Sequence, residues 1–171
     1  MEEGIVCFAF GTPGRIKSNR ALSDIVYERA ACNVVPVLTQ KDLIGVSMSM
    51  RVEFVREDPK NPASTLDIAH QAVAWAMRRD IQKLQVVAAP QHLWRVLRDL
   101  EYAIGKAHAA IEVEVAPEVH DFPEETWYCA DSGQRFHRSK KVWDRYDRIM
   151  RVIPMQIYVF VYARLRQFYA P

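Results

Sequence analysis

Five short apolar runs alternate along the chain with longer segments in which apolar residues recur every three or four positions. The runs have the length of β-strands and lie at residues 4–10, 33–38, 50–55, 84–89 and 110–115. The segments between them have the period of amphipathic helices. Alternating strands and helices predict a parallel sheet with right-handed crossovers. We therefore predict an α/β chain with a Rossmann-like three-layer fold, a mainly parallel sheet of about five strands and a C-terminal helical extension.

Residues 84–95 form the clearest strand-to-helix unit. The apolar run ends at Pro90, and the following helix has an apolar face made of Leu93, Val96, Leu97, Leu100 and Ile104. A strand that is apolar on both faces is typical of the centre of a parallel sheet. His92 and Arg95 lie where this strand gives way to its helix, three residues apart and therefore on one face of the first helical turn.

The carboxyl ends of parallel strands share one edge of the sheet, and ligands bind at that edge in open α/β folds. The prediction brings four segments together there, at residues 11–15, 39–41, 57–64 and 90–95. In the first segment, Gly11 and Gly14 allow the backbone to approach an anion closely, although a plain tight turn would need them equally.

Charge near two predicted helix starts also points to an anionic ligand. Arg15, Lys17 and Arg20 crowd the start of the first helix, and Arg95 lies in the first turn of a later one. Cations at this end oppose the helix dipole, and a bound anion would relieve the repulsion. The alternative is that these side chains extend into solvent.

Capping residues predict two of the helix starts. Ser18 or Asn19 is expected to cap the first helix, whose buried side carries apolar residues from Leu22 onward. Ser64 is followed three residues later by Asp67, a short form of the capping box.

Composition narrows the function classes. Half of the 171 residues are apolar, which suits one domain with a sizeable core, and the net charge of +2 favours neither a nucleic-acid nor a membrane partner.

The odd set Cys7, Cys32 and Cys129 predicts reduced thiols in a cytoplasmic protein. The apolar run at 153–165 is too short to span a bilayer, so no membrane insertion is expected. No metal site is predicted, because the His and Cys residues lack paired ligand spacing.

The C-terminal part differs in character from the rest. We predict one domain over 1–171, with 126–171 a helical extension packed on it. Aromatic residues about one turn apart at 135–150 predict a core-facing stripe with a solvated basic face, rather than a nucleic-acid interface. Trp143, Tyr146 and Tyr158 are expected to be largely buried, either on the sheet or against a second copy of the chain.

The middle of the chain resembles the DUF218 family, the YdcF-like proteins that include SanA and ElyC. That family has a strand, a Thr-Ser pair, and then a His and an Arg three residues apart at a helix start. His92 and Arg95 match this pattern, whereas Ala88 and Ala89 replace the hydroxyl pair. The family's Asn-Thr-x-Glu-Asn-Ala helix start is similar to residues 64–69, in which Thr65 is kept. The resemblance implies a Rossmann-like fold and a nucleotide-like or phosphate-bearing ligand.

Our leading hypothesis is a small anionic ligand, nucleotide-like or phosphate-bearing, held at the carboxyl edge of the sheet. The candidate ligand-binding residues are Gly11, Thr12, Gly14, Arg15, Arg20, Thr65, Asp67 and Arg95. His92 is the candidate acid or base if the protein is an enzyme, with Glu57, Asp58 or Asp67 as its carboxylate partner. No cofactor follows from the sequence. The alternative hypothesis is a non-catalytic protein that keeps the fold and forms a homo-oligomer through its aromatic tail.

Overall fold

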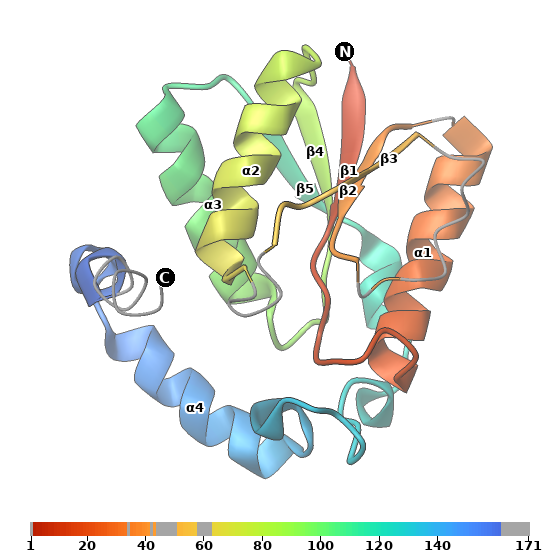
Figure 1. Cartoon of the computed structure of the whole chain (residues 1–171), viewed down its shortest axis with the longest axis vertical. Helices are drawn as coiled ribbons and strands as arrows, with labels where there is room; N and C mark the ends of the chain where they lie inside the picture. The colour runs from red at the N-terminus through yellow and green to blue at the C-terminus, as the bar shows by residue number, and fades with distance from the viewer. Residues whose placement is uncertain (1, 34, 42, 44–50, 58–62, 162–171) are drawn as a thin grey trace.

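The chain forms one parallel sheet of five strands in the order β3-β2-β1-β4-β5 (Figure 1). The computed structural model describes residues 2–33, 35–41, 43, 51–57 and 63–161. The strands are β1 (Glu3–Cys7), β2 (Val37–Thr39), β3 (Val52–Phe54), β4 (Lys83–Val87) and β5 (Glu112–Val115). All four neighbouring pairs are parallel, which confirms the predicted α/β, Rossmann-like fold.

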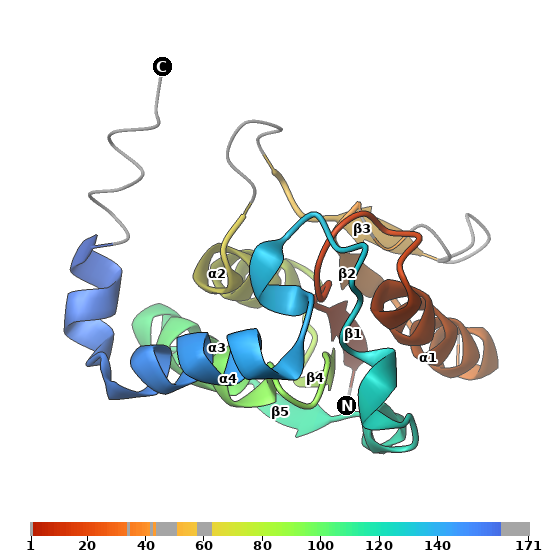
Figure 2. The same cartoon turned by 90° about the horizontal axis from the view of Figure 1, so that it is seen from below.

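Helices cover both faces of this sheet. The α-helices are α1 (Lys17–Asn33), α2 (Thr65–Arg78), α3 (Leu93–Ala107) and α4 (Lys140–Val152). Figures 1 and 2 show α1 on one face and the packed pair α2 and α3 on the other. β1, β2 and β4 are the strands whose residues are mostly buried, as expected for the inner strands of the sheet. None of the described helices has the length and apolar composition needed to cross a bilayer.

The first predicted strand ends earlier than its apolar run. β1 stops at Cys7, yet Phe8 and Phe10 are fully buried. The apolar pattern continues because the loop after the strand is itself part of the core. Likewise, α1 extends to Asn33 and β2 starts only at Val37, whereas the pattern predicts a strand from residue 33.

Ser18 and Asn19 hold the loop after β1 and do not cap α1 as predicted. Both lie within the first turn of α1 and are fully buried. The Ser18 hydroxyl donates to the Phe10 carbonyl at 2.8 Å. Asn19 Oδ1 accepts from the Phe10 amide at 2.8 Å, and its Nδ2 donates to the Gly11 carbonyl at 2.9 Å. These side chains therefore satisfy backbone groups of a buried loop that has no strand partner at these positions.

The tail lies beyond the carboxyl edge of the sheet (Figure 1). It begins with short 3₁₀ turns, η1 (Pro117–His120), η2 (Glu124–Thr126) and η3 (Arg135–His137), and continues through α4 to a helical stretch at 155–161. The predicted extension at 126–171 is thus helical mainly from residue 140, and residues 162–171 lie outside the described part. Trp143 is buried as predicted, but Tyr146 and Tyr158 are only half-buried because they line a cavity.

Asn19→Ala is expected to reduce the free energy of unfolding by about 1–3 kcal/mol, because the buried Phe10 amide would lose its acceptor. Urea unfolding followed by circular dichroism measures this change. Arg20→Ala, at an exposed position of the same helix, is the control. Equal stability of the two variants would show that the Asn19 contacts do not hold the loop.

Candidate functional site

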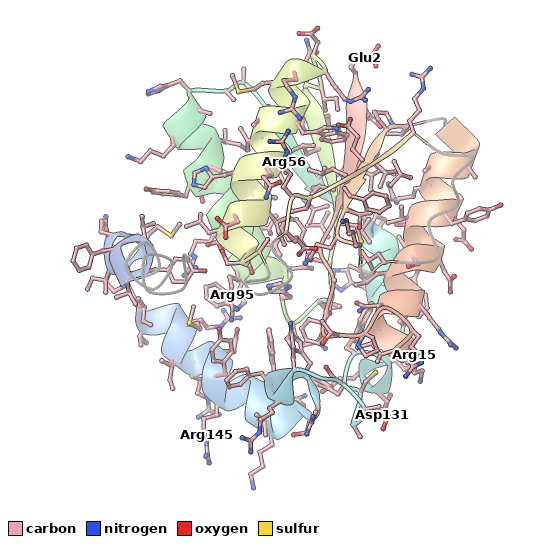
Figure 3. The ribbon with its side chains drawn as sticks, viewed as in Figure 1. Glu2, Arg15, Arg56, Arg95, Asp131 and Arg145 are labelled. Carbon is pink, nitrogen blue, oxygen red and sulfur yellow. The ribbon has the colours of Figure 1, made fainter. Side chains whose placement is uncertain are left out.

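A cavity of about 450 Å³ lies between the carboxyl edge of the sheet and the tail. The sheet and the starts of α2 and α3 supply one side, with Gln40, Ser64, Thr65, Ile68, His92 and Arg95. The tail supplies the other, with Gln134, Phe136, His137, Trp143, Tyr146, Met150, Ile153, Ile157, Tyr158 and Val161. Arg95 lies between α3 and the tail in Figure 3.

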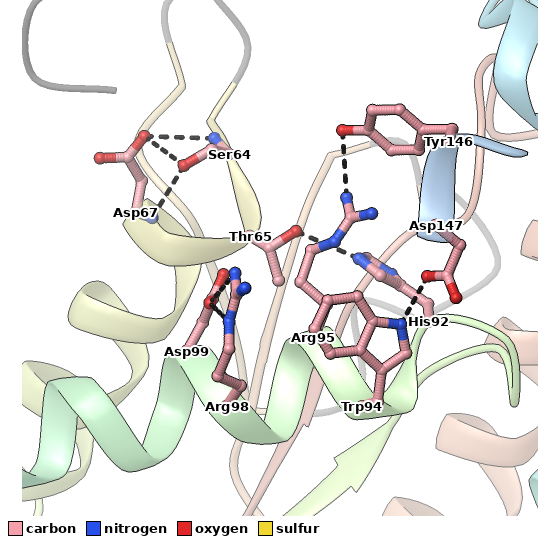
Figure 4. Close-up of polar contacts among 10 residues, drawn as sticks. All are labelled: Ser64, Thr65, Asp67, His92, Trp94, Arg95, Arg98, Asp99, Tyr146 and Asp147. Carbon is pink, nitrogen blue, oxygen red and sulfur yellow. Dashed lines mark hydrogen bonds and ion pairs between the residues drawn. The ribbon is translucent and has the colours of Figure 1, made fainter. Parts of the chain in front are cut away.

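Arg95 is a buried cation held by aromatic groups. Its side chain is at the start of α3 and the residue is only 6% exposed. Nη1 donates to the Tyr146 hydroxyl at 3.4 Å (Figure 4). The guanidinium lies 4.8 Å from the centre of the Tyr146 ring and 5.4 Å from that of Trp143. Nε and Nη2 are covered from solvent and have no hydrogen-bond partner among the described residues.

The nearest acidic residue on α3 does not neutralise this charge. Asp99 lies one turn further along α3, is fully buried, and pairs instead with Arg98 at 2.8 Å. Burial raises the pKa of Asp99, although Arg98 and Arg95 act in the opposite direction. Within the described part of the chain, Arg95 forms no ion pair. The cavity wall therefore carries a desolvated positive charge.

His92 lies beside Arg95 and is paired with a hydroxyl group. Its Nε2 is 3.1 Å from Thr65 Oγ1 at the start of α2, and the residue is 7% exposed (Figure 4). Burial, and then the positive charge of Arg95, holds the pKa of His92 well below its usual range. The imidazole is thus neutral at pH 7. A neutral imidazole can accept a proton at one nitrogen and donate from the other.

The predicted carboxylate partners of His92 serve other groups. Glu57 accepts a hydrogen bond from Gln40 at 2.8 Å. Asp67 completes the predicted capping box, in which its carboxylate accepts from the Ser64 amide and hydroxyl. Asp58 lies outside the described residues. Thr65 is the partner that the structure provides for His92.

The glycine loop predicted to face the ligand is covered by the tail. Gly11 has φ of 92°, and a Cβ placed there would lie 2.7 Å from Ser132 Oγ. The Gly133 amide donates to the Thr12 carbonyl at 2.7 Å. Neither Gly11, Thr12 nor Gly14 lines the cavity. The loop therefore packs against residues 132–133 and lies apart from the cavity that Arg95 lines.

Arg15 and Arg20 also lie apart from Arg95. They line a separate groove at the start of α1, together with Lys17, Cys129 and Asp131. Figure 3 places Arg15 near Asp131, well away from Arg95. Of the predicted site residues, the structure brings together Thr65, His92 and Arg95 in the cavity wall.

The tail contributes cavity residues that the sequence did not assign to a site. His137 packs against Phe10 and Trp143, with ring centres 4.4 and 5.0 Å apart. Burial and the charge of Arg95 lower the pKa of His137 to about 4. The position of Gln40, directly after β2, is a signal that sequence analysis could have used. His137 and Tyr146 carry no such signal, because their place depends on how the tail returns to the sheet.

The two histidines that line the cavity, His92 and His137, are expected to make the protein less stable as the pH falls. The unfolded chain protonates His92 and His137 near pH 6.5, whereas the folded-state pKa is well below this value for His92 and about 4 for His137. The unfolded state then binds more protons, so stability is fully present above pH 6.5 and decreases toward pH 4, by up to ~1.4 kcal/mol per pH unit for each histidine.

His137→Gln is expected to flatten this dependence in urea-unfolding curves recorded between pH 4.5 and 6.5, the interval below the ordinary histidine pKa. His120→Gln, which removes an exposed histidine of η1, is the control. The same slope in both variants and the parent chain would contradict a neutral His137 in the folded state.

Comparisons with known proteins do not assign a family or a function to the chain. No family model matches the chain, and no curated protein or solved structure is significantly similar to it. The DUF218 resemblance therefore stays a prediction, and the cavity itself supplies the observations on which a function is proposed.

Proposed function

We propose that the chain binds a small anionic ligand in the cavity at the carboxyl edge of the sheet, with Arg95 as the partner of the negative charge. The observation that carries this proposal is a buried residue that lines a cavity and whose guanidinium has two nitrogen atoms without a partner in the described part of the chain. Buried polar groups in folded proteins are nearly always paired, and an exception requires an explanation. A ligand anion is the explanation that fits a cavity.

The energetic argument is one of desolvation. Removing a charged group from water costs several kcal/mol unless an opposite charge or good hydrogen bonds replace the lost water. The Trp143 and Tyr146 rings offset part of this cost through cation–π contacts. An anion that enters the cavity would supply the remaining charge-assisted hydrogen bonds.

His92 and Thr65 would position or react with the other polar groups of the ligand. Their mutual contact at 3.1 Å leaves His92 Nδ1 without a partner among the described residues. We assign His92 the acid or base role, because a neutral imidazole can take up a proton from a ligand hydroxyl or return it. Phosphate-bearing and nucleotide ligands, which the DUF218 resemblance implies, belong to the class to be tested.

Arg95→Met is the direct test. The variant is expected to have equal or higher stability without ligand, because it replaces an unpaired buried charge by an apolar side chain of similar length. It is expected to lose about 1.5–3 kcal/mol of anion affinity. Thermal unfolding of both chains with acetate, hexanoate, inorganic phosphate, sugar phosphates and AMP measures the two effects, since a ligand of the native state raises Tm.

Arg145→Met, at an exposed position of α4, is the matched control. A clear loss of stability in Arg95→Met, together with unchanged anion responses, would show that Arg95 is a structural residue and would refute the proposed function.

Assembly through the tail is the second candidate function. Several large apolar side chains in the tail are exposed, with Ile149 56%, Val152 77% and Phe160 59% accessible. Exposed apolar side chains concentrated in one segment are typical of interaction surfaces.

If the tail assembles copies of the chain, sedimentation velocity is expected to show a species larger than the monomer. The substitutions Val152→Asp and Phe160→Asp would dissociate it by burying a charge at the contact. Lys141→Asp, at an exposed polar position of α4, is the control. A protein that sediments as a monomer at all concentrations would contradict assembly through the tail.

A further inference from the structure

We infer that the ligand of this cavity is a singly charged carboxylate with an apolar alkyl or aryl body, rather than a phosphate-bearing molecule. This inference rests on the proposed function, because it assumes that the cavity binds an anion at Arg95. It is carried by three features of the wall: the number of its charges, the shape of the free guanidinium edge and the apolar character of the side opposite Arg95.

The charge count favours a monoanion. Arg95 is the one cationic side chain among the described residues that line the cavity. His92 and His137 also line it, but His92 is buried and His137 partly buried beside Arg95, which disfavours a second and third positive charge. A phosphate monoester carries nearly two negative charges at neutral pH. One guanidinium would leave part of that charge uncompensated in a desolvated site, whereas it neutralises a carboxylate completely.

The two Arg95 nitrogen atoms that lack a partner among the described residues are arranged to match the two oxygens of a carboxylate. Nη1 donates to the Tyr146 hydroxyl, whereas Nε and Nη2 have no partner among the described residues. Both atoms are covered from solvent, so a carboxylate would reach them by displacing the side chains that cover them. These two nitrogen atoms lie on one edge of the planar guanidinium, where their N–H bonds are parallel. Two parallel N–H donors match the two oxygens of a carboxylate in a bidentate pair. A single-point cation such as lysine would lack this match.

The far side of the cavity suits an apolar body. Beyond Trp143 and Tyr146, which lie beside Arg95, and Tyr158, the side chains that α4 and the following helical stretch contribute are Met150, Ile153, Ile157 and Val161. On the sheet side, Ile68 of α2 is buried against the same space. A hydrocarbon or aromatic group bound here would exchange contact with water for contact with these apolar side chains. Burial of each additional CH₂ group is then expected to raise affinity by up to about fourfold.

Isothermal titration calorimetry with matched probes tests this inference on the full chain at pH 8. The probes are hexanoate, hexanamide and hexyl phosphate, which share one body and differ in charge, together with octanoate and AMP. Hexanoate is expected to bind at least tenfold more tightly than the other two six-carbon probes and AMP, and octanoate more tightly than hexanoate. Arg95→Gln is expected to abolish the preference for hexanoate over hexanamide, and Arg95→Lys to retain only part of it. Arg145→Gln is the control and is expected to bind as the parent chain does.

The outcomes separate the inference from the function on which it rests. Tighter binding of hexyl phosphate or AMP than of hexanoate, lost in Arg95→Gln, would overturn the carboxylate assignment and leave anion binding intact. Equal affinity for hexanoate and octanoate would contradict the inference that the ligand has an apolar body. Anion affinities that do not change in either folded Arg95 variant would overturn both proposals.

Discussion

The site depends on one constraint: Arg95 carries a positive charge that is enclosed where the tail meets the sheet and has no carboxylate partner among the described residues. Arg95 is 6% exposed and lines the cavity. Its guanidinium lies against the rings of Trp94, Trp143 and Tyr146 and donates to the Tyr146 hydroxyl. The buried acids Asp99 and Asp147 are paired with other arginines, Asp99 with Arg98 and Asp147 with Arg151. A fold under selection for stability alone gains nothing from such a charge, because an apolar side chain in its place would avoid the cost of desolvation.

The tail creates this environment by attaching to the start of α3. Trp94 Nε1 donates to Asp147 of α4 at 2.5 Å (Figure 4). The Arg151 guanidinium lies 4.5 Å from the centre of the Trp94 ring. Trp143 then reaches the rings of Phe10 and His92 at the edge of the sheet. The contact between tail and sheet therefore both closes the cavity and removes water from Arg95.

The sequence predicts the sheet well because its signals are local. The apolar run before Pro90 and the Ser64–Asp67 pair each specify one element without reference to the rest of the chain, and the structure has β4 and the capping box there. The same reasoning places His92 and Arg95 at the start of α3, since a parallel sheet fixes where its helices begin.

Sequence patterns do not predict the position of a residue when that position depends on packing between distant parts of the chain. The glycines of the first loop suggested an anion cradle, but the loop is covered by Ser132 and Gly133, which are more than a hundred residues away in the chain. For the same reason His137 and Tyr146 could not be assigned to the cavity. Periodicity shows that the aromatic residues of the tail share a face, but it does not show what that face meets.

The Nε–H signal of Arg95 in ¹H–¹⁵N spectra tests the central claim most directly, because it reports on the nitrogen that lacks a partner. It is identified by its absence from the spectrum of Arg95→Lys, and hexanoate is then titrated into the parent chain. Our account predicts that this proton moves downfield and exchanges more slowly with water as the probe saturates the site, as expected for a new charge-assisted hydrogen bond. A signal that stays unchanged while calorimetry shows the probe to be bound would contradict it.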